Sequence, residues 1–196
     1  MKANQLPIND FLQKPDVQFV IPVYQRNYDW TTAECMQLLE DIISVEKEER
    51  GTHFIGSIVY IHDGIYTASD INELVIIDGQ QRLTTLSILN VALYHFAKEN
   101  DLQQDAGRVY NKFIINQYVD NESYKLKLKQ TDRNSKAYQA LLSNEVVEFS
   151  EFSNVIENYN YFKNTINEQN FKTIVDGLKR LIFVDISLER GKDDPQ

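Results

Sequence analysis

The chain has 196 residues, a length that suits one domain or two small ones and that can bury a substantial core. Its net charge of -9 and its pI of about 4.8 argue against a broad nucleic-acid surface and leave room for a local basic pocket. The single cysteine, Cys35, excludes an internal disulfide and fits a reducing cytoplasm. No signal peptide and no apolar run of membrane-spanning length is recognisable, so we expect a cytoplasmic protein with no membrane partner.

The first predicted elements are a helical turn, a strand and a helix. Residues 8–12 can form one turn of helix. The apolar residues 17–23 predict a strand that lies at a sheet edge or ends near Pro22, because proline cannot donate to a ladder. Thr31 and Glu34 have the spacing of a capping box, which predicts the start of a long helix.

A polar and aromatic run without periodicity, residues 24–30, separates that strand from that helix. Loops of this type often carry function on a rigid scaffold, although a surface loop with its aromatic side chains in the core is the alternative. Residues 53–62 predict a second strand, in which Gly56 indicates a bulge or a close approach to the backbone. Asp63-Gly64 predicts the turn that follows.

The most informative stretch is a junction between a third strand and a helix. Residues 74–77 form a continuous apolar run that predicts a buried strand, and leucines at helical spacing begin at Leu83. The link between them is only four residues long, so a helix N-terminus with unpaired N–H groups lies at the carboxyl end of a strand. Such a terminus binds anions readily, and Arg82 adds a fork of donors that suits phosphate or carboxylate.

A structural interpretation of the same junction stays open at this point. Asp78 is an acceptable N-cap, and Gln81 three residues later completes a pair that resembles a capping box, with Gly79 easing the turn. His53, at a strand start, can reach a pocket or serve as a structural histidine. The three histidines of the chain give no multi-histidine metal signature.

The second half of the chain is predicted to be mostly helical. Helices are expected over residues 102–118, 134–142, 152–166 and 171–178, before a strand-like run at 181–188. Residues 124–129 alternate strictly, which predicts a half-buried strand or extended arm with Lys125, Lys127 and Lys129 on one face. A soft boundary near Asn100 divides the chain into 1–100 and 101–196, and its abrupt end resembles that of a trimmed piece.

Polar clusters follow two of the predicted strands, at Tyr24-Gln25-Arg26 and at Asp78-Gly79-Gln80-Gln81-Arg82. If these strands lie parallel in one sheet, their carboxyl ends converge on a crevice, the usual ligand position in α/β sheets. The two arginines and the backbone amides suit a polyphosphate. The carboxylate of Asp78 can hold a divalent cation such as Mg²⁺ together with the phosphates. A glutamine of these clusters can orient an attacking water. The P-loop, GxSxG, HExxH and CxxC motifs are absent from the sequence.

Three motifs in a fixed order give the sequence a family resemblance. They are Ile21-Pro22-x-Tyr24-Gln25-Arg26-x-Tyr28-x-Trp30, His53-Phe54-Ile55-Gly56-Ser57-Ile58 and Ile77-Asp78-Gly79-Gln80-Gln81-Arg82-Leu83-Thr84-Thr85-Leu86. Together they resemble the N-terminal domain of GmrSD-type restriction systems, and the runs at 124–128 and 158–162 extend the resemblance over most of the chain. The family's fold is similar to the ParB and sulfiredoxin group. This implies an α+β fold, with a small mixed sheet and helices around a nucleotide pocket in 1–100 and a mostly helical extension in 101–196.

The resemblance also implies an activity, which is binding and hydrolysis of a nucleoside triphosphate (NTP) with a divalent cation such as Mg²⁺. This activity would serve a defence system that restricts modified phage DNA. By resemblance, the catalytic residues are Asp78, Gln80, Gln81 and Arg82, with Asp78 also the metal ligand. The nucleotide-binding residues are Tyr24, Gln25, Arg26, Gly79 and His53.

The chain departs from the family pattern in one respect. Family members usually continue beyond the equivalent of Gln196, and many carry a C-terminal HNH nuclease domain. No HNH pattern is present here, so we expect that this piece does not cut DNA by itself. The sulfiredoxin branch is disfavoured because its chemistry needs a reactive thiol beside the phosphate loop, whereas Cys35 lies in a predicted helix.

Two other functions stay open from the sequence. One is a ParB-like module that binds nucleotide or DNA as a switch without consuming it. The other is a reader of modified DNA that uses residues 24–30 and the arm with Lys125, Lys127 and Lys129. The acidic balance of the chain makes the DNA reader the weakest of the three hypotheses.

Overall fold

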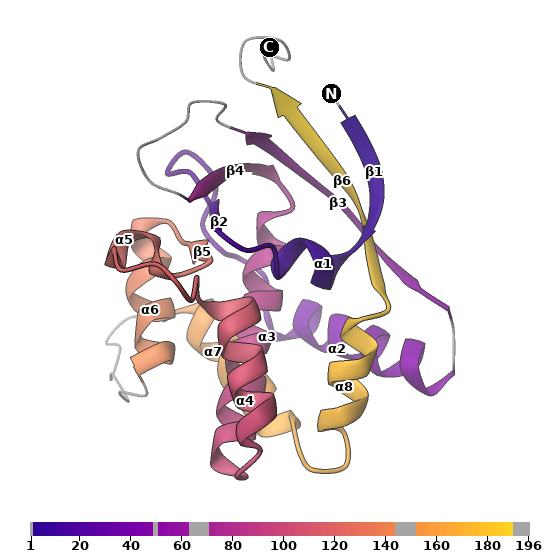
Figure 1. The fold of residues 1–196 in the computed structure, drawn as a ribbon. Coiled ribbons are helices and arrows are strands. Elements are labelled where there is room, and N and C mark those ends of the chain that lie inside the picture. The colour runs from indigo at the N-terminus through magenta and orange to yellow at the C-terminus, as the bar shows by residue number, and fades with distance from the viewer. Residues whose placement is uncertain (1, 49–50, 63–70, 144–151, 190–196) are drawn as a thin grey trace.

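The computed structural model describes residues 2–48, 51–62, 71–143 and 152–189. The fold is of the α+β class that the sequence predicts, and within the described residues a six-stranded mixed sheet is covered by helices (Figure 1). The strands are β1 (Lys2–Pro7), β2 (Val17–Val20), β3 (His53–His62), β4 (Asn72–Asp78), β5 (Leu128–Lys129) and β6 (Leu181–Glu189). The helices are α1 (Ile8–Leu12), α2 (Thr32–Lys47), α3 (Gln80–Glu99), α4 (Gln103–Val109), α5 (Glu122–Lys125), α6 (Asp132–Ser143), α7 (Asn154–Thr165) and α8 (Phe171–Leu178), with a π-helical turn η1 (Tyr110–Ile114) after α4.

The sheet has the strand order β1-β6-β3-β4-β2-β5. The β2–β4, β2–β5 and β3–β6 pairs are parallel, and the β1–β6 and β3–β4 pairs are antiparallel. The last strand, β6, lies between β1 and β3, so the two ends of the described chain meet within the sheet. Strand β4 lies beside β2 and runs parallel to it, so the two polar clusters follow the carboxyl ends of neighbouring strands.

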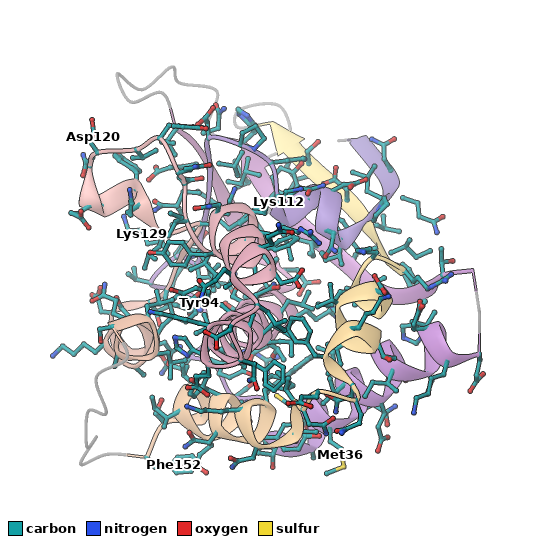
Figure 2. The ribbon with its side chains drawn as sticks, turned by 60° about the horizontal axis from the view of Figure 1, so that its bottom comes forward. Met36, Tyr94, Lys112, Asp120, Lys129 and Phe152 are labelled. Carbon is teal, nitrogen blue, oxygen red and sulfur yellow. The ribbon has the colours of Figure 1, made fainter. Side chains whose placement is uncertain are left out.

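Helix α3 is the centre of the helical layer. Fifteen of its 20 residues are buried, which means that neighbours surround it on nearly every side. It packs against α4, η1, α6 and α7. Figure 2 turns the helical side toward the viewer, and the exposed side chains of Met36 and Phe152 lie near the rim of this side.

Helix α2 begins as predicted and packs closely on α8. The Thr31 side chain accepts a hydrogen bond from the backbone of the first turn, and the Glu34 carboxylate accepts one from Thr31 N at 2.7 Å, so the capping box is confirmed. Gly177 of α8 lies against the backbone of α2, where an added Cβ would be 2.2 Å from the Ile42 carbonyl oxygen. This contact fixes how closely the two helices approach each other.

Several boundaries differ from the sequence predictions. The sequence did not predict β1, half of whose residues are polar and which forms by pairing with the distant β6. Strand β2 ends at Val20, before Pro22, which has no N–H for the ladder. The helix expected over 102–118 is shorter and ends as the π-helical turn η1. The turn expected at Asp63-Gly64 lies outside the described residues, and the domain boundary near Asn100 stays a prediction.

The predicted lysine-faced strand over 124–129 is wrong. The Asn121 side chain accepts a hydrogen bond from Ser123 N and caps the short helix α5. This helix includes the first two residues of the predicted strand. Lys127 is only 3% exposed, and its ammonium group donates to the Lys14 carbonyl oxygen at 2.6 Å. Its burial lowers the pKa of Lys127 to about 8. Because one of the three lysines is buried, they do not form a common surface for DNA.

Candidate functional site

The two polar clusters meet at the carboxyl ends of neighbouring parallel strands. Val20 of β2 is in register with Val75 of β4, so both chains leave the sheet in the same direction. A hollow with a volume of about 380 Å³ lies beyond these ends. Its lining comes from both clusters and from Trp30: Gln25, Arg26, Trp30, Asp78, Gly79, Gln80, Gln81 and Arg82. The parallel arrangement that the crevice hypothesis requires is therefore present.

The strand-to-helix junction needs glycine at position 79. Gly79 has φ +90° and is the N-cap of α3, and an added Cβ would be 2.9 Å from Ile58 Cγ1 and 3.0 Å from the Ser57 carbonyl oxygen. No side chain caps α3, and its first turn contains no acidic residue. The interpretation of Asp78 as the N-cap is wrong, because Gly79 holds that position and the Asp78 side chain makes no cap hydrogen bond. The N–H groups of the first turn of α3 are left without helical acceptors beside the hollow.

Arg82 lies on a glycine of the neighbouring strand β3. Gly56 has φ +102°, and the β3–β6 register shifts between Phe54 and Ser57, so the predicted bulge is confirmed. An added Cβ at Gly56 would be 2.9 Å from Arg82 Cζ, which confirms the close approach as well. The Arg82 guanidinium also donates through Nη1 to the Ser57 carbonyl oxygen at 3.2 Å. The motif at 53–58, through Gly56 and Ser57, therefore positions the arginine of the motif at 77–86.

Gln81 holds the backbone of the loop that precedes α2. Its Oε1 accepts hydrogen bonds from Asp29 N at 3.1 Å and Trp30 N at 3.4 Å, and its Nε2 donates to the Asn27 carbonyl oxygen at 3.1 Å. Gln81 is buried, and both polar atoms of its carboxamide bind the loop backbone. The partners lie about fifty residues away in sequence, at separations of 51 to 54.

Two further glutamines join the same segments. Gln80 Nε2 donates to the Arg26 carbonyl oxygen at 3.3 Å, and Gln25 Nε2 donates to the Ile77 carbonyl oxygen at 2.9 Å. Gln80 Oε1 is buried and has no partner among the described residues. The carboxamides of the two motifs thus cross-link the loop and the strand end on both sides of the hollow.

A buried hydroxyl network behind the hollow was not found from the sequence. Tyr28 Oη lies 2.7 Å from Thr85 Oγ1 and accepts from Asn158 Nδ2 at 2.8 Å, and Asn158 also donates to the Trp30 carbonyl oxygen. Burial raises the pKa of Tyr28 well above its usual value, so the phenol stays neutral. Thr85 lies one helical turn after Gln81, which is a signal for the same face of α3, whereas Asn158 belongs to a helix far along the chain.

A comparison with known protein families identifies the chain that carries this geometry. The family model described as the GmrSD restriction endonuclease, N-terminal domain, matches residues 8–196. The chain belongs to this family. The family assignment associates the chain with GmrSD-type restriction systems. No curated protein matches the chain.

In this GmrSD N-terminal domain, Tyr24 and His53 lie outside the hollow. The Tyr24 side chain is 70% exposed and does not line it. His53 lines a neighbouring hollow of about 340 Å³ and has its Nε2 3.5 Å from Asp41 Oδ2. The two hollows adjoin, because Trp30 and Arg82 line both of them.

The charges around the hollow of the GmrSD N-terminal domain are one carboxylate and two guanidinium groups. Arg26 is exposed and has its Nη1 3.2 Å from Asp29 Oδ2. Asp78 is exposed, and no cation of the described residues pairs with it. The described part of the chain contains no group of three or more His, Cys, Asp or Glu residues that could hold a metal ion.

Among the helices described, none has the length and apolar character needed to cross a membrane.

Proposed function

We propose that this GmrSD N-terminal domain binds a nucleoside triphosphate in the hollow between β2, β4 and α3 and hydrolyses it. The observation that carries the proposal is that Arg26 and Arg82, from motifs far apart in sequence, line one hollow at the N-terminus of α3. Two guanidinium groups and a free helix terminus are a strong set of donors for a phosphate chain.

The two arginines have different parts in this proposal. Arg82 is held by Gly56 and Ser57, so it is preorganised for a phosphate group at a fixed position. Arg26 is exposed and its partner, Asp29, is also exposed, so an exchange of this ion pair for a phosphate contact costs little. Arg26 would therefore close over a bound triphosphate while Arg82 stays in place.

The residues present fit a divalent cation beside the phosphates. Asp78 would hold it, since this exposed carboxylate lines the hollow and has no cationic partner among the described residues. Mg²⁺ is commonly bound by one or two carboxylates together with substrate phosphates, so one protein ligand suffices. The cation would supply charge neutralisation of the phosphate oxygens.

A second candidate function is a switch that binds the nucleotide without consuming it. It is favoured by the hydrogen bonds of Gln81 and Gln80, which use three of their four carboxamide atoms to hold loop backbone. Gln81 is then occupied by loop backbone in this conformation, whereas Gln80 Oε1 has no partner among the described residues and stays free to orient water. Restriction of modified phage DNA by the full system, through a separate nuclease domain or subunit, belongs to the same proposal and is supported by the family assignment.

Nucleotide binding and phosphate release, measured separately with Mg²⁺, test both candidates. We expect Arg82→Gln and Asp78→Asn to lose turnover, and Arg82→Gln to weaken binding as well. Asp120→Asn is the matched control, because this exposed carboxylate lies outside the hollow. Tight binding without phosphate release would favour the switch. Equal turnover in all three variants would remove Asp78 and Arg82 from the mechanism.

A further inference from the structure

Residues 26–30 form the part of the loop between β2 and α2 that borders the hollow, and they have no regular secondary structure. Two of them, Arg26 and Trp30, line the hollow, and Trp30 also lines the adjoining hollow at His53. Trp30 is the only tryptophan of the 196-residue chain. A nucleotide in the proposed site would lie beside this residue, so the position of the loop decides the shape of the site.

Side chains from two helices hold this loop in place. Among the described residues, the N–H and C=O groups of 26–30 make no hydrogen bond to other main-chain groups. Instead, Gln81 of α3 accepts from the N–H groups of Asp29 and Trp30, and Asn158 of α7 donates to the Trp30 carbonyl oxygen at 2.8 Å. Buried main-chain groups need partners, so the place of Trp30 depends on one side chain of α3 and one of α7.

Asn158 is itself fixed by its surroundings. It is fully buried in α7, and its Nδ2 also donates to Tyr28 Oη at 2.8 Å, which lies 2.7 Å from Thr85 Oγ1 of α3. Helix α7 packs against α3, α6 and α2. Because apolar packing between these helices does not depend on the amide, loss of the Asn158 amide should free the Trp30 peptide while the helices stay packed.

We infer that Asn158 is a positioning residue of the nucleotide site, an assignment that rests on the proposed function. Its amide holds the Trp30 peptide and thereby keeps Trp30 in the wall that the two hollows share. Asn158 lies in the second half of the chain, beyond the boundary expected near Asn100. The site therefore needs the helical part of the chain as well as residues 1–100.

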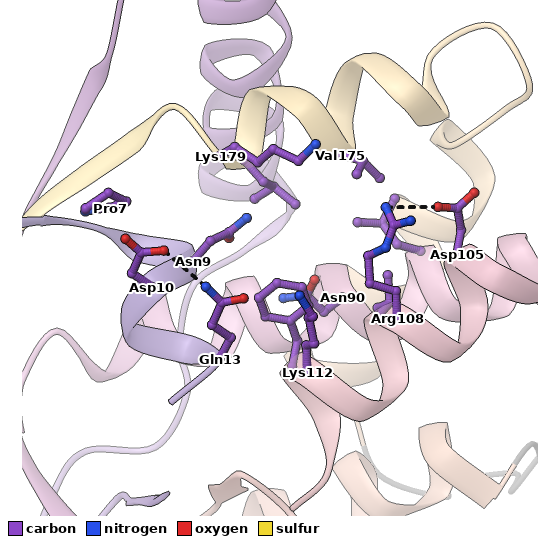
Figure 3. A pocket seen from close by; sticks show the side chains of 14 residues that line it. Pro7, Asn9, Asp10, Gln13, Asn90, Asp105, Arg108, Lys112, Val175 and Lys179 are labelled. Atoms are coloured by element: carbon purple, nitrogen blue, oxygen red, sulfur yellow. Dashed lines mark hydrogen bonds and ion pairs between the residues drawn. The ribbon is translucent and has the colours of Figure 1, made fainter. Parts of the chain in front are cut away.

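Two other buried asparagines provide matched controls. Asn116 is 3% exposed, its Nδ2 donates to the carbonyl oxygens of Val17 and Tyr124, and its Oδ1, like that of Asn158, has no partner among the described residues. Asn90 is equally buried in α3 and lines a separate pocket between α1, α3, α4, η1 and α8 (Figure 3). Neither asparagine lines the two hollows, so their variants report the loss of a buried amide away from the loop.

The fluorescence of Trp30 tests the assignment without any ligand, since no other tryptophan contributes. In Asn158→Ala, the emission maximum should shift to longer wavelength and acrylamide should quench the emission more strongly, because a released indole meets more water. Asn116→Ala and Asn90→Ala should keep the emission and the quenching of the unmodified chain. Urea denaturation of all three variants shows whether their losses of stability are comparable.

Equilibrium dialysis with nonhydrolysable analogues of ATP, CTP, GTP and UTP, each with Mg²⁺, tests the link to the nucleotide site. Asn158→Ala should weaken the tightest of these complexes by about fivefold, the factor that corresponds to one ordinary hydrogen bond. The two control variants should bind the same analogue as tightly as the unmodified chain.

The assignment is overturned if Asn158→Ala keeps the Trp30 fluorescence of the unmodified chain, or if it weakens nucleotide binding no more than Asn116→Ala does. If Asn158→Ala does not fold, Asn158→Ser and Asn116→Ser, which keep a hydroxyl group in each buried position, are compared by the same criteria. Failure of the unmodified chain to bind any of the four analogues would contradict the proposed function and the assignment with it. Equal binding by all variants would contradict the assignment alone.

Discussion

The contact between Gly56 and Arg82 gives the sharpest mutational test of the site. In Gly56→Ala, the new Cβ would be 2.9 Å from both Arg82 Cζ and Nη2, at a φ of +102° that side chains rarely adopt. The backbone strain costs about 1–3 kcal/mol, and the displaced guanidinium loses a charge-assisted hydrogen bond to Ser57 worth about 1.5–3 kcal/mol before screening by solvent. We expect a net loss of stability of about 2–4 kcal/mol.

Urea denaturation measures this loss, with Gly51→Ala as the control. No atom lies within 4 Å of a Cβ added at Gly51, and its φ is not in the positive range, so its stability should change by less than about 0.5 kcal/mol. Because Arg82 moves, Gly56→Ala should also weaken binding of an NTP with Mg²⁺ by about tenfold, which corresponds to about 1.4 kcal/mol. The reasoning is refuted if Gly56→Ala unfolds at the same urea concentration as Gly51→Ala and binds nucleotide as tightly as the unmodified chain.

Three other predictions concern packing and pH. Gly177→Ala should destabilise the chain by about 1–3 kcal/mol, because the new Cβ would clash with the Ile42 backbone. Gly107→Ala in α4 has no atom within 4 Å of the new Cβ and should stabilise the chain by about 0.8–1 kcal/mol. The urea midpoints of the two variants measure the difference. The pKa of Lys127 falls from 10.5 to about 8 on folding, so the unfolded state binds more protons between these two pH values. The free energy of unfolding should therefore rise with pH across this range by up to about 3 kcal/mol. Denaturation curves of Lys127→Met at several pH values should lack this rise. Burial lowers the pKa of His95 below its unfolded value of 6.5, so the stability of the fold should fall as the pH drops below that value. Thermal unfolding of His95→Gln should show a smaller loss of stability over the same pH range. An equal loss in the variant would exclude His95 as the cause.

The features that the sequence predicted well depend on local rules. The capping box of α2 needs only residues three apart, and the bounds of β3 follow from an apolar run between polar breaks. The bulge at Gly56 was also predictable, because a glycine inside a strand often marks a bulge or a close backbone approach. Most of the residues that the family motifs predicted to share a site line one hollow, whereas Tyr24 and His53 lie outside it.

The features that the sequence did not show depend on distant partners. The alternation at 124–129 matches a strand, yet Lys127 is buried because a carbonyl group 113 residues away accepts a hydrogen bond from its ammonium group. Gln81 was assigned to hydrolysis, and its hydrogen bonds to the loop at Asp29 and Trp30 could not be derived from spacing. Strand β1 likewise exists through its pairing with β6 at the other end of the chain.

The most direct test of the account is a crystal structure of the chain with a nonhydrolysable triphosphate and Mg²⁺. The account predicts phosphate oxygens within hydrogen-bond distance of the Arg26 and Arg82 guanidinium groups and of the first N–H groups of α3, with the cation at Asp78. A triphosphate bound elsewhere, or phosphates that contact neither arginine, would contradict it.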